Sequence, residues 1–151
     1  VLPYLGEYGL QDRVMRFADS SATVELAAGC VGCQPAQIAK TLSFKVNDGA
    51  MLIVTAGDAK IDNAKYKAHF HQKAAMLSYD EVETLIGLRV GGVCPFGAKV
   101  PVYLDESLRR FETVYPAAGD DHSAVRLTPQ EMETASHAAG WVDVCKGWNE
   151  V

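Results

Sequence analysis

The sequence has no long apolar run and no excess of positive charge. No stretch approaches the roughly 18 consecutive apolar residues that a membrane-spanning helix needs, and no signal peptide opens the chain. The formal net charge of −5 over 151 residues disfavours a general nucleic-acid coat protein. With four cysteines and no secretory segment, we expect reduced thiols, a cytoplasmic location and no membrane association.

Several common signatures of catalysis and of multidomain chains are missing as well. There is no Walker phosphate loop, because its spacing and its terminal Lys-Ser/Thr are absent. No nucleophile–histidine–carboxylate set can be picked out. Without repeats, linkers or low-complexity tracts, residues 1–151 are expected to form a single domain, with residues 1–9 as a lead-in segment. The composition, 48% hydrophobic and 22% charged, is that of an ordinary globular core.

Charge is distributed unevenly along this acidic chain. Residues 40–73 contain six lysines and three aspartates, a local charge of +3, so the remainder carries −8. A basic face on an acidic protein suits a small anionic or phosphate-bearing partner better than a long duplex.

Periodicity and turn signals predict one α+β domain. Asn47-Asp48-Gly49 predicts a hairpin, and Thr23, Asp105 and Thr128 are candidate helix caps, the last with Glu131 in a capping box. Helices are expected over residues 10–18, 23–28, 35–42, 61–70, 79–86, 105–111 and 129–139, and strands over 42–46, 51–55, 74–77, 100–104, 112–115, 124–127 and 141–145. We predict a curved, mixed and mostly antiparallel sheet, curling toward a barrel, with flanking helices.

The first candidate site segment is the stretch 34–46. Pro35 suits the first turn of a helix, and Lys40 falls on its expected last turn, directly before a strand of alternating polarity. Lys40 is either a solvated or C-capping lysine, or a lysine held rigidly and aimed at a phosphate or ester oxygen.

Two glycine-containing segments are further candidates. In the loop 90–97, the amides of Gly91 and Gly92 can approach a ligand closely and stabilise an oxyanion, with Pro95 holding the bend; a tight structural turn is the alternative. The turn 117–122 presents His122, either as a hydrogen-bond partner for an amino group or water, or as a solvated residue.

The cysteines and the remaining histidines point to packing or surface roles. Cys30-x-x-Cys33 lies between two short helices rather than after a strand, and Cys94 and Cys145 are isolated, so neither a redox pair nor a zinc site is favoured. His69 and His71 read as surface residues. We therefore expect no metal and no cofactor.

Taken together, these segments resemble the YbaK/ProX superfamily of aminoacyl-tRNA editing domains, which also occurs as the insertion domain of bacterial prolyl-tRNA synthetases. The resemblance rests on Ile38-Ala39-Lys40-Thr41-Leu42, the Gly91-x-x-x-Pro95 loop and the Ala-Ala-Gly-x-x-His turn at 117–122, in this order, and it covers residues 10–145. It implies the mixed sheet expected above. It also implies a free-standing trans-editing deacylase, a hydrolase of translation fidelity that cuts the ester of a mischarged aminoacyl-tRNA. Cys30 and Cys33 depart from the family pattern.

The resemblance also implies roles for individual residues. Catalytic roles fall on Lys40, Gly91, Gly92 and His122, and substrate-binding roles on Phe44, Val93, Pro95 and Gly119. An aminoacyl ester is already activated, so a positioned water and a stabilised oxyanion suffice for hydrolysis.

The implied partner is the 3′-terminal aminoacyl-adenosine of tRNA, with an aminoacyl-tRNA synthetase as a second partner. A small amino acid such as alanine, on the tRNA for proline, is the first choice of substrate. Two rivals stay open: a non-catalytic nucleotide- or nucleic-acid-binding module with an aromatic platform at Phe44, and a thiol-redox protein using Cys30 and Cys33.

Overall fold

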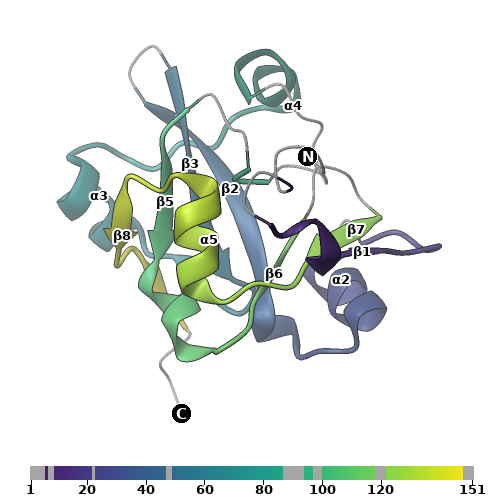
Figure 1. The fold of residues 1–151 in the computed structure, drawn as a ribbon. Helices are drawn as coiled ribbons and strands as arrows, with labels where there is room; N and C mark the ends of the chain where they lie inside the picture. The colour runs from purple at the N-terminus through teal and green to yellow at the C-terminus, as the bar shows by residue number, and fades with distance from the viewer. Residues whose placement is uncertain are drawn as a thin grey trace.

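A twisted five-stranded sheet forms the centre of the molecule (Figure 1). The computed structural model describes residues 6, 9–21, 23–46, 49–86, 94–96, 100–117 and 122–147. The strand order is β6 (Tyr115–Pro116), β2 (Ile38–Val46), β3 (Gly49–Ala56), β5 (Val102–Asp105) and β8 (Gly140–Val142). Two small sheets accompany it: β1 (Val14–Arg16) with β7 (Ser123–Val125), and β4 (Lys60–Ile61) with β9 (Cys145–Lys146).

The antiparallel pair β2–β3 is the longest pairing in the sheet. Its register runs through eight residue pairs, from Val46↔Gly49 to Ala39↔Ala56, so the predicted hairpin is confirmed, although Asn47 and Asp48 lie outside the described residues. Every residue of β3 after Gly49 is buried. Its continuous apolar run is typical of a central strand that is covered on both faces.

Parallel neighbours flank this hairpin and make the sheet mixed, as predicted. The pairs β2–β6, β3–β5 and β5–β8 are all parallel. Antiparallel pairing is therefore confined to β2–β3 within the central sheet and to the two small sheets, a smaller share than the sequence suggested. Parallel pairs need long crossovers, and their partners lie far apart in sequence, so local turn signals do not reveal them.

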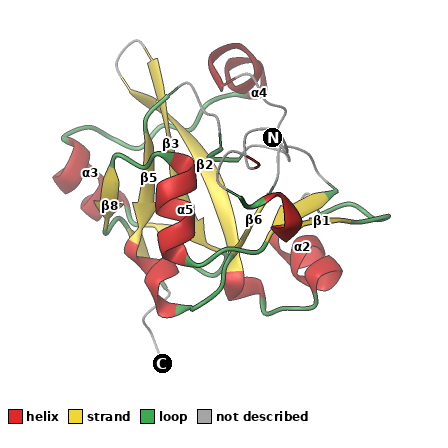
Figure 2. Cartoon of the chain, in the orientation of Figure 1, coloured by secondary structure: helices red, strands yellow, loops and turns green. Residues whose placement is uncertain are grey.

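Helices and single turns surround the sheet (Figure 2). Thr23 caps its helix by accepting from the backbone N–H of Leu26, and Thr128 and Glu131 form the expected capping box. The elements are η1 (Gln11–Arg13), α2 (Val24–Val31), η2 (Pro35–Gln37), α3 (Asn63–Phe70), α4 (Tyr79–Glu81), the π-helical turn η3 (Val82–Ile86), η4 (Glu106–Arg110) and α5 (Pro129–Ser136). No helix among them is long and apolar enough to cross a membrane.

The core lies between the sheet and these helices. Met132 and Ala135 of α5 are fully buried in it. Phe44 of β2 packs against Tyr66 of α3, with ring centroids 5.1 Å apart, and Tyr66 packs in turn on Phe70 at 4.9 Å. One side of β2 is thus closed by aromatic packing.

Two predicted helices are wrong. Residues 10–18 form only the turn η1 and then β1, which pairs with β7 through Val14↔Val125. Residues 35–42 form only the single turn η2, so Lys40 lies within a strand rather than on the last turn of a helix. In both cases pairing with a partner strand outweighs the local apolar spacing.

Near the C-terminus, two expected elements also differ. The helix predicted to reach residue 139 ends at Ser136, where His137 takes the left-handed cap conformation with φ 52°, and Gly140 begins β8 instead. The strand expected over 141–145 is divided between β8 and β9, which belong to different sheets.

Candidate functional site

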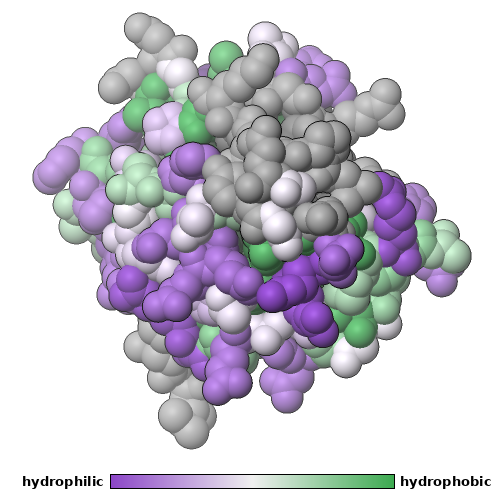
Figure 3. Space-filling view, viewed as in Figure 1, coloured by the Kyte–Doolittle hydropathy of each residue, from purple (hydrophilic) through white to green (hydrophobic). Residues whose placement is uncertain are grey.

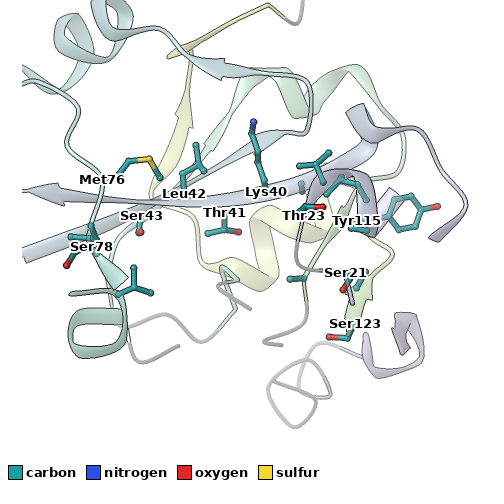
Figure 4. Close-up of a pocket in the computed structure, with 18 residues that line it drawn as sticks. Ser21, Thr23, Lys40, Thr41, Leu42, Ser43, Met76, Ser78, Tyr115 and Ser123 are labelled. Atoms are coloured by element: carbon teal, nitrogen blue, oxygen red, sulfur yellow. The ribbon is translucent and has the colours of Figure 1, made fainter. Parts of the chain in front are cut away.

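A cavity of about 590 Å³ lies beside β2, at a gap in its pairing (Figure 4). Strand β6 pairs with β2 only at Ile38 and Ala39, and further along Met76 forms an isolated bridge with Phe44. Between these points, residues 40–43 have no strand partner on this edge among the described residues. The cavity walls come from α2 and the segment before it, β2, residues 76–82, and the region of β6 and β7.

Hydroxyl groups are concentrated in this cavity. They come from four separate parts of the chain, so only the fold brings them together; they belong to Ser21, Thr23, Thr41, Ser43, Ser78 and Ser123. A cavity of this size with several polar groups on a largely apolar wall is typical of a small-molecule site.

Alternation along β2 decides which side chains share a side. In Figure 4, Thr41 and Ser43 point to one side of the strand, toward the region where Ser21, Ser78 and Ser123 lie. Lys40 and Leu42 point to the other side. Lys40 therefore borders the cavity from the unpaired edge of β2, with its ammonium directed away from the hydroxyl groups.

The unpaired edge of β2 also presents backbone groups. The carbonyl of Ser43 accepts from the N–H of Leu77 at 3.2 Å, and the N–H of Lys45 donates to the carbonyl of Ala75 at 2.7 Å. Because backbone groups alternate between the two edges of a strand, those of Thr41 point to this same edge. Thr41 thus borders the cavity with both its side chain and its N–H.

Lys40 is half-buried and electrostatically strained. Burial lowers the pKa of its ammonium below the ordinary lysine value, and nearby Lys60 lowers it further, while Cys145, Asp58 and Glu25 oppose the shift. Burial also raises the pKa of the Cys145 thiol, so that thiol is neutral at pH 7. Asp58 is engaged by Arg110, whose guanidinium donates to it at 3.0 Å. Lys40 has no ion pair within the described part of the chain, and an anionic ligand would relieve this burial.

The other predicted site residues are scattered. Phe44 is 1% exposed, belongs to the core against Tyr66 and does not line the cavity, so we no longer assign it to substrate binding. Pro95 is buried and also outside the cavity wall. His122 is exposed and directly precedes Ser123 of the cavity wall. Gly91, Gly92, Val93 and Gly119 lie outside the described residues.

The cysteines are free thiols in the structure. Cys30 ends α2 and its Sγ lies 3.7 Å from the carbonyl of Ser20, and burial raises the pKa of the Cys33 thiol. A raised pKa is the opposite of what a reactive redox thiol needs. Among the described residues, no group of three or more His, Cys, Asp or Glu side chains is arranged to hold a metal ion.

Comparison with known proteins defines the class. The model of the aminoacyl-tRNA editing domain matches residues 18–135, a span that contains β2 and most of the cavity wall. The chain belongs to this family.

Individual relatives agree with this assignment. The chain is 50% identical over 151 residues to the uncharacterized protein YwhH of Bacillus subtilis, covering 98% of this chain and 96% of that protein. It is 32% identical over 88 residues to the proline–tRNA ligase of Thermotoga sp. (strain RQ2), covering 58% of this chain but only 15% of the ligase. A crystal structure described as a candidate trans-editing enzyme for prolyl-tRNA synthetase matches with a TM-score of 0.85 and 30% identity, covering 96% of this chain and 94% of that one.

Most of the hydroxyl groups carry no signal in the sequence. Thr41 stands beside Lys40 in the segment that carries the resemblance, and alternation extended backward from Leu42 would have placed it on a strand. Ser21 and Ser123 occur in ordinary polar surroundings, and only the pairing of β1 with β7 and the packing of α2 bring them to the cavity.

Proposed function

We propose that this protein is a free-standing deacylase that hydrolyses the ester of a mischarged aminoacyl-tRNA carrying a small amino acid. The observation that carries the proposal is the cavity on the unpaired edge of β2, within a chain that belongs to the editing-domain family. The likeness to the candidate trans-editing enzyme over almost its whole length supports activity outside a synthetase.

The size and character of the cavity suit the end of a charged tRNA. Its volume of about 590 Å³ falls in the range of sites that enclose a ligand of the size of an aminoacyl nucleoside. The exposed Met76, which is 60% accessible and lines the cavity, offers apolar surface to a base. A large amino acid and the adenosine would compete for the same space. Small side chains are therefore favoured, with alanine on the tRNA for proline as the sequence-based first choice.

The chemistry needs a water molecule and a stabilised oxyanion. Water adds to the ester carbonyl carbon, the bond from that carbon to the ribose oxygen breaks, and the ribose oxygen takes up a proton, leaving free amino acid and tRNA. In our proposal the N–H groups at Gly91 and Gly92, together with that of Thr41 on the β2 edge, stabilise the oxyanion. Lys40 balances the charge of the terminal phosphate, and His122 orients the water or the α-amino group.

Deacylation of a defined mischarged tRNA tests the proposal. Alanyl-tRNA for proline is expected to be hydrolysed well above the spontaneous rate, whereas phenylalanyl-tRNA is expected to be spared. A protein that binds uncharged and charged tRNA equally and cleaves neither would instead be a non-catalytic nucleic-acid-binding module, and the proposal would be withdrawn. Burial of Phe44 already removes the aromatic platform that this rival would have used.

A further inference from the structure

Two hydroxyl groups in the cavity wall have no hydrogen-bond partner. The Oγ of Ser21 and the Oγ1 of Thr41 are buried without a partner in the structure. Ser21 is only 9% exposed. The one other buried oxygen with this property among the described residues is the hydroxyl of Tyr66, which lies in the core. Buried hydroxyls in folded proteins are almost always paired, so the two in the cavity call for a ligand.

The other hydroxyls with a known partner in this cavity are already engaged in holding helix ends. The Oγ1 of Thr23 accepts from the N–H of Leu26 at 3.2 Å at the start of α2. The Oγ of Ser78 accepts from the N–H of Glu81 at 3.3 Å at the start of α4. Ser21 and Thr41 have no such structural task. The distinction separates hydroxyls that build the cavity from hydroxyls that remain available to its contents.

We infer that Ser21 and Thr41 form a subsite for a hydroxyl-bearing amino-acid side chain, so that serine and threonine esters are preferred to alanine and other apolar esters. The inference rests on the proposed function and names its substrate class. A ligand hydroxyl can donate one hydrogen bond and accept another, so it can satisfy both wall hydroxyls at once. A methyl group in the same place leaves both unpaired, and sites built around such groups discriminate strongly.

The two residues differ in how they can reach the ligand. Thr41 is fixed by its pairing with Val54 in the β2–β3 hairpin, and its β-branched side chain has few staggered positions. Ser21 precedes α2 outside regular structure, and its hydroxyl can turn among three staggered positions toward the cavity. Thr41 therefore sets the position of the ligand hydroxyl, and Ser21 adjusts to it.

Pairs of isosteric esters on one tRNA provide the test. Serine is compared with 2-aminobutyrate and threonine with valine, because each pair differs by a hydroxyl in place of a methyl group. For the unaltered protein, kcat/KM is expected to be about tenfold to a hundredfold higher for the hydroxyl-bearing member. Ser21→Ala and Thr41→Val are each expected to lower this ratio by several-fold. Ser78→Ala removes a cavity hydroxyl that is already engaged, and it is expected to keep the ratio.

Two results would overturn the subsite. Equal kcat/KM for serine and 2-aminobutyrate esters with the unaltered protein is one. The other is an equal loss for every ester in Ser21→Ala and Thr41→Val, which would mean that the hydroxyls contact atoms common to all substrates.

Binding of 3′-amide analogues of seryl- and 2-aminobutyryl-adenosine, measured by calorimetry, separates this inference from the proposed hydrolysis. Preference for the seryl analogue without turnover of any ester would keep the subsite and refute the deacylase. Absence of preference in binding would refute the subsite whatever the turnover.

Discussion

Two groups of buried polar side chains in this molecule have opposite hydrogen-bonding states. Around Asp105, every oxygen is used: its Oδ2 accepts from the N–H of Ser107 and its Oδ1 from the N–H of Val144, both at 3.0 Å. The Oγ of Ser107 accepts in turn from the N–H of Ala56 at 3.1 Å. In the cavity, the hydroxyls of Ser21 and Thr41 are buried without partners.

The difference separates structure from candidate function. The Asp105 group links β3, β5 and the segment before β9, so it holds parts of the sheet together. The cavity hydroxyls link nothing, and their burial is unfavourable until a ligand supplies partners. A protein retains such groups where they serve its function rather than its stability.

The largest effect on stability is expected from Asp105→Ala. Two buried N–H groups, those of Ser107 and Val144, would lose their acceptor, and each stranded donor costs about 1–3 kcal/mol. We expect the free energy of unfolding to fall by about 3 kcal/mol in chemical denaturation. Asp143→Ala is the matched control, because Asp143 is exposed and forms only a surface ion pair with Lys65; it should change stability by about 1 kcal/mol or less. Similar losses in both variants would contradict the structural role of Asp105.

Lys40→Met is expected to have the largest effect on deacylation. If its ammonium stabilises charge on the substrate, kcat/KM should fall on the order of a hundredfold. Stability should hold, since a half-buried lysine without an ion pair is replaced by an apolar chain of similar length.

Lys45→Met on the same strand is the control, since that lysine is exposed and paired with Glu81 at 2.8 Å. It should leave kcat/KM within about twofold, because a solvent-exposed charge contributes little to a distant site. A folded Lys40→Met protein of normal activity would remove Lys40 from the proposed site.

Thr41→Val and Thr55→Val test the comparison on adjacent strands. The Oγ1 of Thr55 donates to the carbonyl of Ala56 at 3.3 Å, whereas that of Thr41 has no partner. Removing the first hydroxyl should destabilise the protein by about 1 kcal/mol, and removing the second should be neutral or stabilise it by up to about 1 kcal/mol. Denaturant midpoints of the two variants measure the difference. Destabilisation by Thr41→Val equal to that of Thr55→Val would show that its hydroxyl is bonded in the folded protein.

Sequence patterns predicted the elements whose cause is local. Thr23, Asp105 and Thr128 cap the elements they were expected to cap, because an N-cap depends on a side chain and backbone groups only two or three residues away. The hairpin was found for the same reason. By contrast, β1 depends on pairing with β7 near the other end of the chain, and its residues were read as a helix from apolar spacing alone.

The candidate site was predictable only in part for the same physical reason. Lys40 was singled out, but its setting was not: the strand β2 begins at Ile38, so period-two alternation separates Lys40 from the side that carries Thr41 and Ser43. Exposed apolar residues were not foreseen either. Figure 3 shows apolar surface on the side where α2 lies, and Leu26 of that helix is 49% exposed. Exposure and cavity walls arise from tertiary packing, which no local pattern contains.

The smallest expected effect is a shift in pH dependence that isolates the charge on Lys40. Burial lowers the pKa of this lysine in the folded protein, whereas the unfolded chain keeps the ordinary value of 10.5. Between these two values the unfolded state binds more protons, so stability should rise with pH across that window. Over the same window the charged form is lost from the folded protein, and deacylation that uses it should decline after subtraction of spontaneous hydrolysis.

The difference between unaltered protein and Lys40→Met removes the contributions of all other titrating groups. In the variant, the alkaline gain in stability should disappear, and its residual deacylation should not decline between pH 8 and 10, a range of about two units below the ordinary lysine pKa. Denaturation and initial rates at matched pH values supply both curves. Parallel curves for the two proteins would mean that Lys40 keeps an ordinary pKa, and its half-buried position would then carry no electrostatic strain for a ligand to relieve.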